Sequence, residues 1–401
     1  MPSMDVAEAK ARVCAEVDRR ADVLLEVSHH LHAHPELGYE EHEAHATLTG
    51  VLDREGLAPT RHAYDLPTAF EAAHGADGPT VVVCLEYDAL PGIGHACGHN
   101  IIAAAGLGAG LAAATVAEAL GGRVVLLGTP AEEGGAGKIV LAERGAFADA
   151  DAALMVHPAG ADLRWMTTIA IQQLRVAYEG KAAHAAAAPW EGRNALDAAV
   201  LGYMNVAALR QHLAPGERVH GIFTAAGERP NVVPRHAAME WYVRSPTLAS
   251  LEPLKERVLG CLHAGAHAAG CGFTHEWQPR PYADVRDNLV LLAAYEANSE
   301  TLGRPLADPR LAGGVVGSTD MGNVSYLVPS IHPMIKVSPP DVAIHTAEFA
   351  EYAGGPDGDR AVLDGAKAMA MTLVDLWAGP ALLAEARAEL AGATEGTPPS
   401  P

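Results

Sequence analysis

The fold is decided by the stretch Thr80-Val-Val-Val-Cys-Leu-Glu-Tyr-Asp-Ala-Leu-Pro-Gly-Ile-Gly-His-Ala-Cys-Gly-His99 and the apolar run that follows it. Residues 80–85 are short, apolar and β-branched, which predicts a buried strand, and residues 88–98 form a loop rich in Gly and Pro. The apolar run 101–120 predicts a helix. Strand, polar loop and helix in this order are typical of α/β proteins, which carry their ligand sites at the carboxyl ends of strands.

The same alternation continues along the chain. Further strands are predicted at 123–127 and 152–156, and further helices at 138–144, 289–301 and 360–377. We therefore expect an α/β fold with a mainly parallel sheet that has helices on both faces. Upstream, helical spacing from Val6 to Leu52 is interrupted at His34-Pro35, which predicts two helices around a turn.

Between residues 169 and 282 the pattern changes to β-α-β-β-α-β, the order of a ferredoxin-like α+β unit. Its strands are predicted at 169–179, 219–225, 237–244 and 274–278, and its helices at 194–212 and 251–269. We expect a discontinuous first domain, 1–168 and 283–390, interrupted by an inserted domain, 169–282. The tail 391–401 is mostly Gly, Ala, Thr, Ser and Pro, and we expect it to be flexible.

Composition narrows the classes of function. The formal charge of −21, from 49 acidic and 28 basic residues, would repel a phosphate backbone, so no nucleic-acid partner is expected. The run 101–120 has nearly the length of a membrane span, but its three glycines, many alanines and missing basic flanks favour a buried helix. No membrane partner is therefore expected. Five scattered cysteines and the polar, acidic start of the chain predict a cytoplasmic protein without a disulfide framework.

Four polar clusters stand out, and three of them follow predicted strands. They are Asp88 with His95-Ala-Cys97-Gly-His99, Glu132-Glu133, His157-Pro158 and Ile344-His345-Thr346. A lone histidine is more often structural than a ligand, and adjacent glutamates are usually a solvated turn. Here, however, Cys-x-His and Glu-Glu both occupy glycine-rich loops directly after buried strands. Buried charge needs a partner, and a metal ion commonly supplies one.

The same residues give the chain a resemblance to the M20 metallopeptidase and amidohydrolase family. The resemblance rests on residues 86–99, on Glu132-Glu133-Gly-Gly and on Val156-His157-Pro158, with 36 residues from Cys97 to Glu133 and 24 from Glu133 to His157. Further matches at 34–41, 180–184, 231–234 and His345 extend it over nearly the whole chain. Within the family the chain is similar to subfamily D, in the branch of aminobenzoyl-glutamate hydrolases and β-alanyl-lysine dipeptidases. Asn100 departs from the hippurate hydrolases, which commonly have Asp there.

The resemblance implies two divalent metal ions, zinc or manganese, with cobalt and nickel as alternatives. Their implied ligands are Cys97, His99, Glu133, His157 and His345. Cys97 would bridge as a thiolate, His99 and Glu133 would complete one site and His157 with His345 the other, with the partition left open. Purely structural roles are the alternatives: Cys97 can be a plain buried thiol, and His345 can be an ordinary loop histidine.

Two more residues of the first domain have implied roles. Glu132 would act as general base and acid, and Asp88 would orient an imidazole or simply cap a turn.

In the inserted domain, the resemblance implies that His184 donates a hydrogen bond to the oxyanion, often from a partner subunit, and that Asn231 helps to hold substrate. A strand cap is the alternative for His184. Arg235 and Arg244 are candidates for gripping a substrate carboxylate, although both can equally be surface residues. The glycine-rich loop 313–323 lacks a phosphate-loop lysine and is interpreted as a pocket wall.

Together these features predict a metal-dependent hydrolase that cleaves the amide bond of a small N-acyl amino acid or dipeptide-like molecule. The discontinuous domain would bind the metals and carry out catalysis, and the inserted domain would serve as a lid and as the dimerisation surface of a homodimer. Two alternatives remain: a pathway-specific deacylase of a biosynthetic intermediate, and a metal-free homologue that only binds small ligands.

Overall fold

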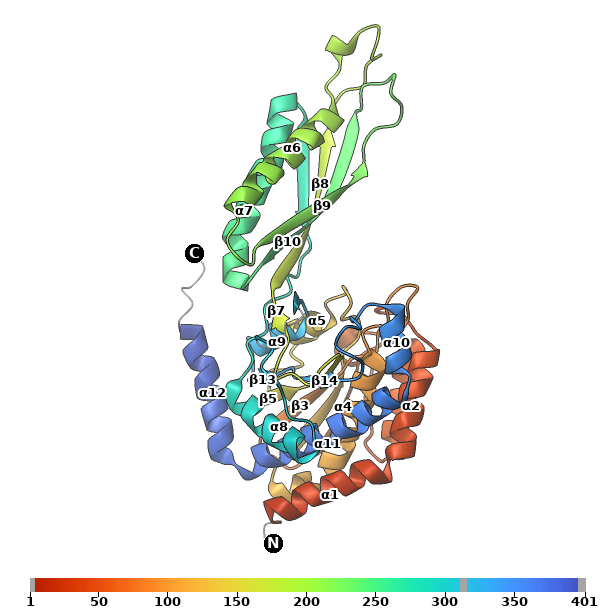
Figure 1. The fold of residues 1–401 in the computed structure, drawn as a ribbon, viewed down its shortest axis with the longest axis vertical. Coiled ribbons are helices and arrows are strands. Elements are labelled where there is room, and N and C mark those ends of the chain that lie inside the picture. Colours follow the sequence, from red (N-terminus) through yellow and green to blue (C-terminus); the bar gives the residue numbers. More distant parts are fainter. Residues whose placement is uncertain (1–3, 311–315, 396–401) are drawn as a thin grey trace. The chain divides into compact units, whose positions relative to one another are not determined.

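The chain folds into two compact units, shown in Figure 1 as a computed structural model that describes residues 4–310 and 316–395. Unit 1 comprises residues 1–167 and 285–401, and unit 2 comprises residues 168–284. The chain therefore leaves unit 1 once and returns to it. Each unit has a buried apolar core of its own.

A six-stranded sheet in the order β1-β2-β4-β3-β5-β13 forms the centre of unit 1. Its strands are β1 (Thr60–Arg61), β2 (Phe70–Gly75), β3 (Thr80–Leu85), β4 (Arg123–Gly128), β5 (Ala152–Leu154) and β13 (Ser330–Ile331). The last four are parallel to one another, whereas β1 and β2 are antiparallel additions at one edge. The predicted mainly parallel sheet is confirmed. The sequence did not reveal β2, because Phe70-Glu-Ala-Ala-His-Gly75 contains no β-branched residue.

Helices cover both faces of this sheet, as predicted. Val81 and Val83 of β3 belong to a core shared with α1 (Val6–Arg19), α4 (His99–Leu120) and α11 (Pro356–Ala378). Val82 and Cys84 belong to a core on α5 (Gly137–Glu143) and α9 (Met321–Ser325). Because successive side chains of a strand point to opposite faces, a strand covered on both sides is apolar throughout.

The apolar helix α4 lies in the middle of the larger core. Among the described residues, α4 is the one helix that by itself is long and apolar enough to cross a membrane. However, 94% of its most apolar 18-residue window is buried inside the protein. A Cβ atom on its Gly110 would lie 2.3 Å from Cγ of Leu126 in β4, so only glycine permits this close packing. The predicted buried helix is confirmed.

The N-terminal segment forms three helices rather than the predicted two: α1, α2 (Ala21–Ala33) and α3 (His42–Arg54). The interruption at His34-Pro35 is present, but a second one falls at Arg20. The Arg20 guanidinium is buried and donates hydrogen bonds to Glu16 and, at 2.8 Å, to Glu55 just after α3. A tertiary ion pair therefore fixes this break, and the helical periodicity carries no sign of it.

The C-terminal part of unit 1 returns to helices: α8 (Leu289–Thr301), α10 (Ala347–Ala353), α11 and α12 (Pro380–Glu395). We predicted that residues 391–395 belong to a flexible tail, but they are part of helix α12. Alanine is the best helix former, and extending an existing helix costs little free energy. Residues 396–401 lie outside the described part of the chain. The short elements are β6 (His157–Ala159), β7 (Thr167–Thr168), β12 (Val316–Gly317), β14 (Met334–Lys336), η1 (Ala63–Asp65), η2 (Pro189–Glu191) and η3 (Arg210–His212).

Unit 2 is a four-stranded antiparallel sheet in the order β11-β8-β10-β9, with two helices packed on one face (Figure 1). Its elements are β8 (Ala170–Glu179), α6 (Ala195–Leu209), β9 (Arg218–Ala225), β10 (His236–Ser245), α7 (Leu248–Ala269) and β11 (Gly272–Trp277). Leu174, Val176 and Tyr178 alternate along β8 toward the helices. This is the ferredoxin-like arrangement that the sequence predicted.

Candidate metal centre

All five side chains that the sequence suggests as metal ligands come together in unit 1. Cys97 lies just before α4 and His99 is the first residue of that helix, whereas Glu133 lies in the loop after β4. His157 opens β6 shortly after β5, and His345 lies just before α10. Because β3, β4 and β5 are parallel, their carboxyl ends meet at one edge of the sheet, where open α/β sheets place their ligands.

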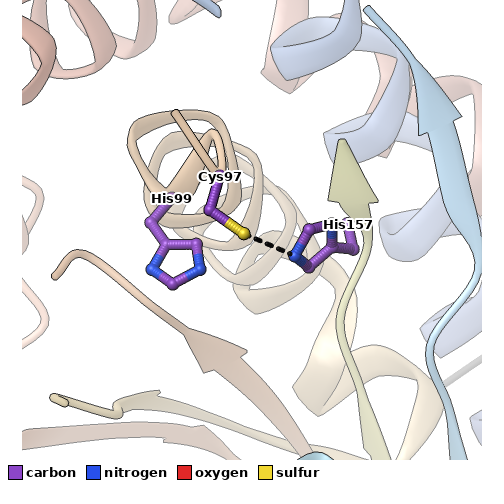
Figure 2. Close-up of side chains that lie close together, drawn as sticks. All are labelled: Cys97, His99 and His157. Carbon is purple, nitrogen blue, oxygen red and sulfur yellow. Dashed lines mark hydrogen bonds between the residues drawn. The ribbon is translucent and has the colours of Figure 1, made fainter. Parts of the chain in front are cut away.

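The Cys97 thiol is at the centre of this group. Its Sγ atom lies 3.4 Å from Nε2 of His157 (Figure 2) and 3.3 Å from Nε2 of His345. Ligand atoms of Cys97, His99 and His157 lie within 4.8 Å of one another, and so do those of Cys97, Glu133 and His345. Two groups of ligands therefore share one thiol.

The sequence left the partition of the ligands between two sites open, and the distances place Glu133 nearer to His345 than to His99. Oε1 of Glu133 lies 3.3 Å from Nε2 of His345 but 3.9 Å from Nε2 of His99. The backbone explains this arrangement, because the His345 N–H donates to the Ala96 carbonyl at 2.8 Å and so fixes His345 beside Cys97. His345 has a left-handed φ of 65°, which costs energy in a residue with a Cβ atom.

Gly98 allows the cysteine and the two histidines to approach one another. Its φ of +78° is left-handed, and a Cβ atom there would lie 2.8 Å from Cγ of Pro158. The turn that starts α4 is thus pressed against the residue that follows His157. Any other residue between Cys97 and His99 would force the two ligand-bearing segments apart.

The arrangement fits a pair of divalent cations. In the described part of the chain, two of the candidate ligand atoms, Nε2 of His99 and Oε1 of Glu133, are buried and form no hydrogen bond, and their nearest polar neighbours are the ion-pair contacts with Glu86 and His345. Unpaired buried polar atoms are costly, and a cation between them would satisfy both. A thiol, imidazoles and a carboxylate are the donor set that zinc and other first-row transition metals prefer.

The electrostatics of Cys97 and His99 depend on each other. Burial, followed by the Glu133 carboxylate, raises the pKa of the Cys97 thiol well above its usual range. Burial opposes a charge on His99, but Cys97 and Asp88 together raise the pKa of His99 well above its ordinary value. A bound cation reverses this balance, because a coordinating thiol is deprotonated.

Asp88 connects two of the ligands. Its Oδ1 accepts a hydrogen bond from Nδ1 of His99 at 3.0 Å, and its Oδ2 accepts one from the backbone N–H of Glu133 at 2.8 Å. Holding Nδ1 in this way leaves Nε2 of His99 directed at the group. A turn cap would not reach a ligand on α4 and the loop after β4 at the same time.

Glu132 lies beside the ligands without belonging to either Cys97 group. It is buried and forms a third close group with His99 and Glu133. Burial, then the charges of Glu86 and Glu133, raise the pKa of Glu132 well above its usual range. Ala131 just before it has a left-handed φ of 57°, and its backbone N–H is held by Glu41. A buried carboxyl group with so strongly raised a pKa is typical of an active site.

The sequence did not reveal a buried ion network beside the ligands. Nζ of Lys138, in α5, lies 2.5 Å from Oε1 of Glu86 and 2.6 Å from Oδ1 of Asp320, and all three side chains are fully buried. Oε2 of Glu86 lies 3.4 Å from Nε2 of His99. Asp320 comes from the glycine-rich loop 313–323, of which residues 313–315 lie outside the described part of the chain. Only the position of Glu86, two residues before Asp88, hinted at this network.

In unit 2, two of the predicted residues lie together. His184 pairs with Val232 in an isolated antiparallel bridge, and the backbone N–H of Ala185 donates to the Asn231 carbonyl at 3.0 Å. The His184 side chain is exposed, and its Nδ1 accepts hydrogen bonds from the backbone N–H groups of Ala186 and Ala187. These bonds leave Nε2 as the nitrogen that carries the proton.

Arg235 and Arg244 do not lie together. They are at opposite ends of β10, nine residues apart on an extended strand, which is roughly 30 Å. Within one subunit they therefore cannot grip the same small carboxylate. Arg235 is exposed and 3.4 Å from Glu228, whereas Arg244 is half-buried over the Tyr242 ring.

Comparison with known proteins agrees with the fold. The model of peptidase family M20/M25/M40 matches residues 83–374, and the chain belongs to this family. Xaa-Arg dipeptidase of Mus musculus is 40% identical over 395 residues, which are 95% of this chain and 91% of the relative. A p-aminobenzoyl-glutamate hydrolase subunit from Escherichia coli K12 is 28% identical over 96% of this chain and 94% of the relative.

A crystal structure from Bacillus subtilis, described as a dinuclear metal-binding peptidase of the M20 family, has a similar fold. Its TM-score is 0.70 at 21% identity, over 90% of this chain and 98% of that one. The protein is therefore a hydrolase of the M20 peptidase and amidohydrolase family, as the resemblance in the sequence implied.

Proposed function

We propose that the protein hydrolyses the amide bond of dipeptides or N-acyl amino acids at a pair of divalent cations held by Cys97, His99, Glu133, His157 and His345. The observation that carries the proposal is the pair of ligand groups that share the Cys97 thiol, with Glu132 beside them. When bound, such cations polarise a carbonyl and make a water molecule acidic near neutral pH. The donor set favours zinc, with manganese, cobalt and nickel as alternatives.

Glu132 moves the proton in this proposal. Its carboxylate takes the proton of the attacking water and later gives it to the nitrogen of the leaving amine. Burial excludes bulk water from the carboxylate, so the proton stays in place until the amine leaves. Asp88 holds Nδ1 of His99 and the backbone of Glu133, and in this way it keeps both ligands oriented during turnover.

The relatives and the charge of the chain both support a particular substrate class. The mouse relative is named for dipeptides that end in arginine, and the Escherichia coli relative for an aminobenzoyl-glutamate amide. Because the chain carries a formal charge of −21, dipeptides with a basic residue are the first class to test. Asn231 and one of the two arginines, Arg235 or Arg244, are candidates to hold the rest of the substrate.

We further propose a homodimer through unit 2, in which His184 of one subunit donates a hydrogen bond to the oxyanion at the metal centre of its partner. Strand β9 is an edge of the sheet in unit 2 and exposes Ile222, which is 65% accessible. Met204 on α6 is 59% accessible. An unpaired edge with apolar side chains favours association. A cytoplasmic location of the dimer, as the sequence suggests, completes the proposal.

Replacing Glu132 by Gln tests the proposed chemistry. Gln cannot accept the water proton, and loss of a general base typically lowers turnover about 10²- to 10⁴-fold. Release of amino acid from basic dipeptides, aminobenzoyl-glutamate and β-alanyl-lysine is measured with zinc or manganese, next to metal analysis of the purified protein. Glu118→Gln on the exposed end of α4 is the control. Unchanged turnover in Glu132→Gln would remove the proposed role, and protein that binds no metal would favour a ligand-binding homologue.

A further inference from the structure

A second group of metal-ligating side chains lies outside the candidate centre. His30 and His34 at the end of α2 and Glu43 at the start of α3 offer ligand atoms that lie within 4.8 Å of one another. Nε2 of His30 is 3.0 Å from Oε1 of Glu43, and the two imidazole centroids are 4.4 Å apart. Glu43 and His34 are exposed and His30 is partly exposed. We propose that these three residues form a separate, solvent-accessible site for a divalent cation of the zinc class.

One hydrogen bond of the His34 ring favours this role. Its Nδ1 lies 2.9 Å from the His30 carbonyl oxygen, which can only accept, so Nδ1 carries the proton. The lone pair is then on Nε2. A metal-ligating histidine usually donates its other ring N–H to a backbone carbonyl or a carboxylate, and His34 already makes such a bond. His30, four residues earlier, is on the same face of α2.

The turn between the two helices holds Glu43 in place. The Glu36 carboxylate accepts hydrogen bonds from the backbone N–H groups of Glu43, at 3.0 and 2.9 Å, and of Ala44, at 2.9 Å. The Ala89 N–H in turn donates to the Glu36 carbonyl at 2.8 Å, which ties the turn to the loop after β3. The first turn of α3 is therefore fixed next to the last turn of α2. A site held in this way costs little reorganisation when the cation binds.

The charges around the group favour a cation of a particular class. The C-terminal end of a helix carries a partial negative charge, and both histidines are at that end of α2. Glu43 adds a full negative charge. Two imidazoles with one carboxylate suit zinc, copper, nickel or cobalt, whereas magnesium and calcium prefer oxygen ligands only. A cation there would link α2 to α3 across the turn.

The experiment uses Zn²⁺ alone as the probe. Equilibrium dialysis followed by elemental analysis counts the zinc bound to wild-type protein and to the double variant His30→Ala/His34→Ala. We expect the variant to bind one equivalent less, or to bind that equivalent about 10- to 100-fold more weakly, since even loss of a group that merely orients a ligand costs this much. In a Cys97→Ala background the same equivalent should remain, which separates this site from the buried centre.

The chain offers a matched control in unit 2. His263 and His267 are exposed, four residues apart on α7, and in the described part of the chain they have no third ligand close by. His263→Ala/His267→Ala should leave zinc binding unchanged. Circular dichroism checks that each variant is folded. Equal zinc binding by wild type and His30→Ala/His34→Ala would overturn the proposal, and so would an equal loss in the control, because any pair of histidines would then suffice.

Discussion

Cys97 carries more of the candidate centre than any other residue, because both groups of ligands include its thiol. Each of the other four ligands belongs to one Cys97 group only. In the proposed centre, a shared thiolate would hold two cations close together and would make their binding interdependent. The burial that raises the pKa of the thiol also means that a proton occupies Sγ whenever no cation does.

This sharing predicts that different ligand variants lose different amounts of metal. Cys97→Ala should lose both ions, whereas His345→Ala should lose one and keep the ion held by Cys97, His99 and His157. Elemental analysis after dialysis measures the ratio of metal to protein. His332→Ala is a suitable control, since its ring lies 5.2 Å from that of His157 without belonging to either group. Equal metal loss in the two ligand variants would contradict the shared thiol.

His45, which lies outside the candidate metal centre, should make the free energy of unfolding depend on pH. Burial, helped by the nearby charges of His62 and Arg61, lowers the pKa of His45 to about 4 from its ordinary 6.5. The folded protein therefore keeps His45 neutral, while the unfolded chain takes up a proton first as the pH falls. The free energy of unfolding therefore has its full contribution from His45 above pH 6.5. That contribution is lost as the pH falls from 6.5 to 4, and the loss is at most about 3 kcal/mol.

His45→Gln should remove this part of the pH dependence. The free energy of unfolding in urea, measured at about pH 7 and about pH 4.5, should fall less in the variant than in wild type. His42→Gln, an exposed histidine in the same helix, should behave like wild type. If His45→Gln lost stability with acid as steeply as wild type, the histidine would not be the titrating group.

At the residue scale, the sequence predicted which side chains come together as candidate ligands, whereas it gave no sign of the buried charges beside them. Cys97, His99, Glu133 and His157 follow strands, and parallel strands bring their ends together. Lys138 gave no such signal. A lysine after three glycines in four positions resembles a solvated turn, and what buries it is Asp320, 182 residues away along the chain.

At the element scale, Lys138 joins three parts of unit 1. Its ammonium lies between Glu86 after β3 and Asp320 before α9, and its backbone N–H at the start of α5 also donates to Asp320 at 2.8 Å. Burial alone would lower the pKa of Lys138, but the charges of Asp320 and Glu86 raise it well above its usual range. The lysine therefore stays charged, and its charge lowers the pKa of both carboxylates beside the candidate ligands, whereas burial still raises the pKa of Asp320 to about 6.

Lys138→Met should destabilise the protein and weaken metal binding together. Removing one partner of a buried ion network leaves uncompensated charge, which typically costs about 3–5 kcal/mol. Thermal unfolding and the zinc dissociation constant are measured for Lys138→Met and for Lys138→Met/Asp320→Asn, which removes one of the two stranded charges and should recover part of the loss. Lys181→Met, at an exposed lysine, is the control. A Lys138→Met protein of unchanged stability and affinity would show that the network is dispensable.

Helices and strands were predictable where a regular repeat of apolar residues in the sequence coincides with a buried face. The run 101–120 and the helix 289–301 are examples, because their apolar residues are numerous and their ends carry clear signals. Strand β2 was missed, since its Ala and Glu residues have no strand preference. The break at Arg20 depends on Glu55, a tertiary partner that no local pattern announces.

At the scale of the whole molecule, the division into two units separates the metal ligands from His184. Residues 168–284 fold around their own core, and all the predicted ligands and Glu132 belong to the other unit. If His184 stabilises the oxyanion, this side chain of unit 2 has to act at a metal centre whose ligands all belong to unit 1. In a symmetric dimer, that group can come from the partner subunit.

Complementation between two inactive variants tests which subunit supplies it. Glu132→Gln and His184→Ala should each be nearly inactive as pure proteins. If His184 acts on the partner's centre, a mixed dimer has one site with an intact Glu132 and an intact His184. Random exchange in an equal mixture should then restore about a quarter of the wild-type activity. Exchange is driven by mild urea and followed by dipeptide hydrolysis against time.

The control for this experiment disrupts the proposed dimer. Ile222→Glu/Met204→Glu places charges on the exposed apolar surface of α6 and β9, and light scattering should then report a monomer. Leu289→Glu, at an exposed leucine of unit 1, should leave the dimer intact. With Ile222→Glu/Met204→Glu added to both inactive variants, mixing should restore nothing. If mixing the original variants also restored nothing while mixed dimers formed, His184 would act within its own subunit or not at all.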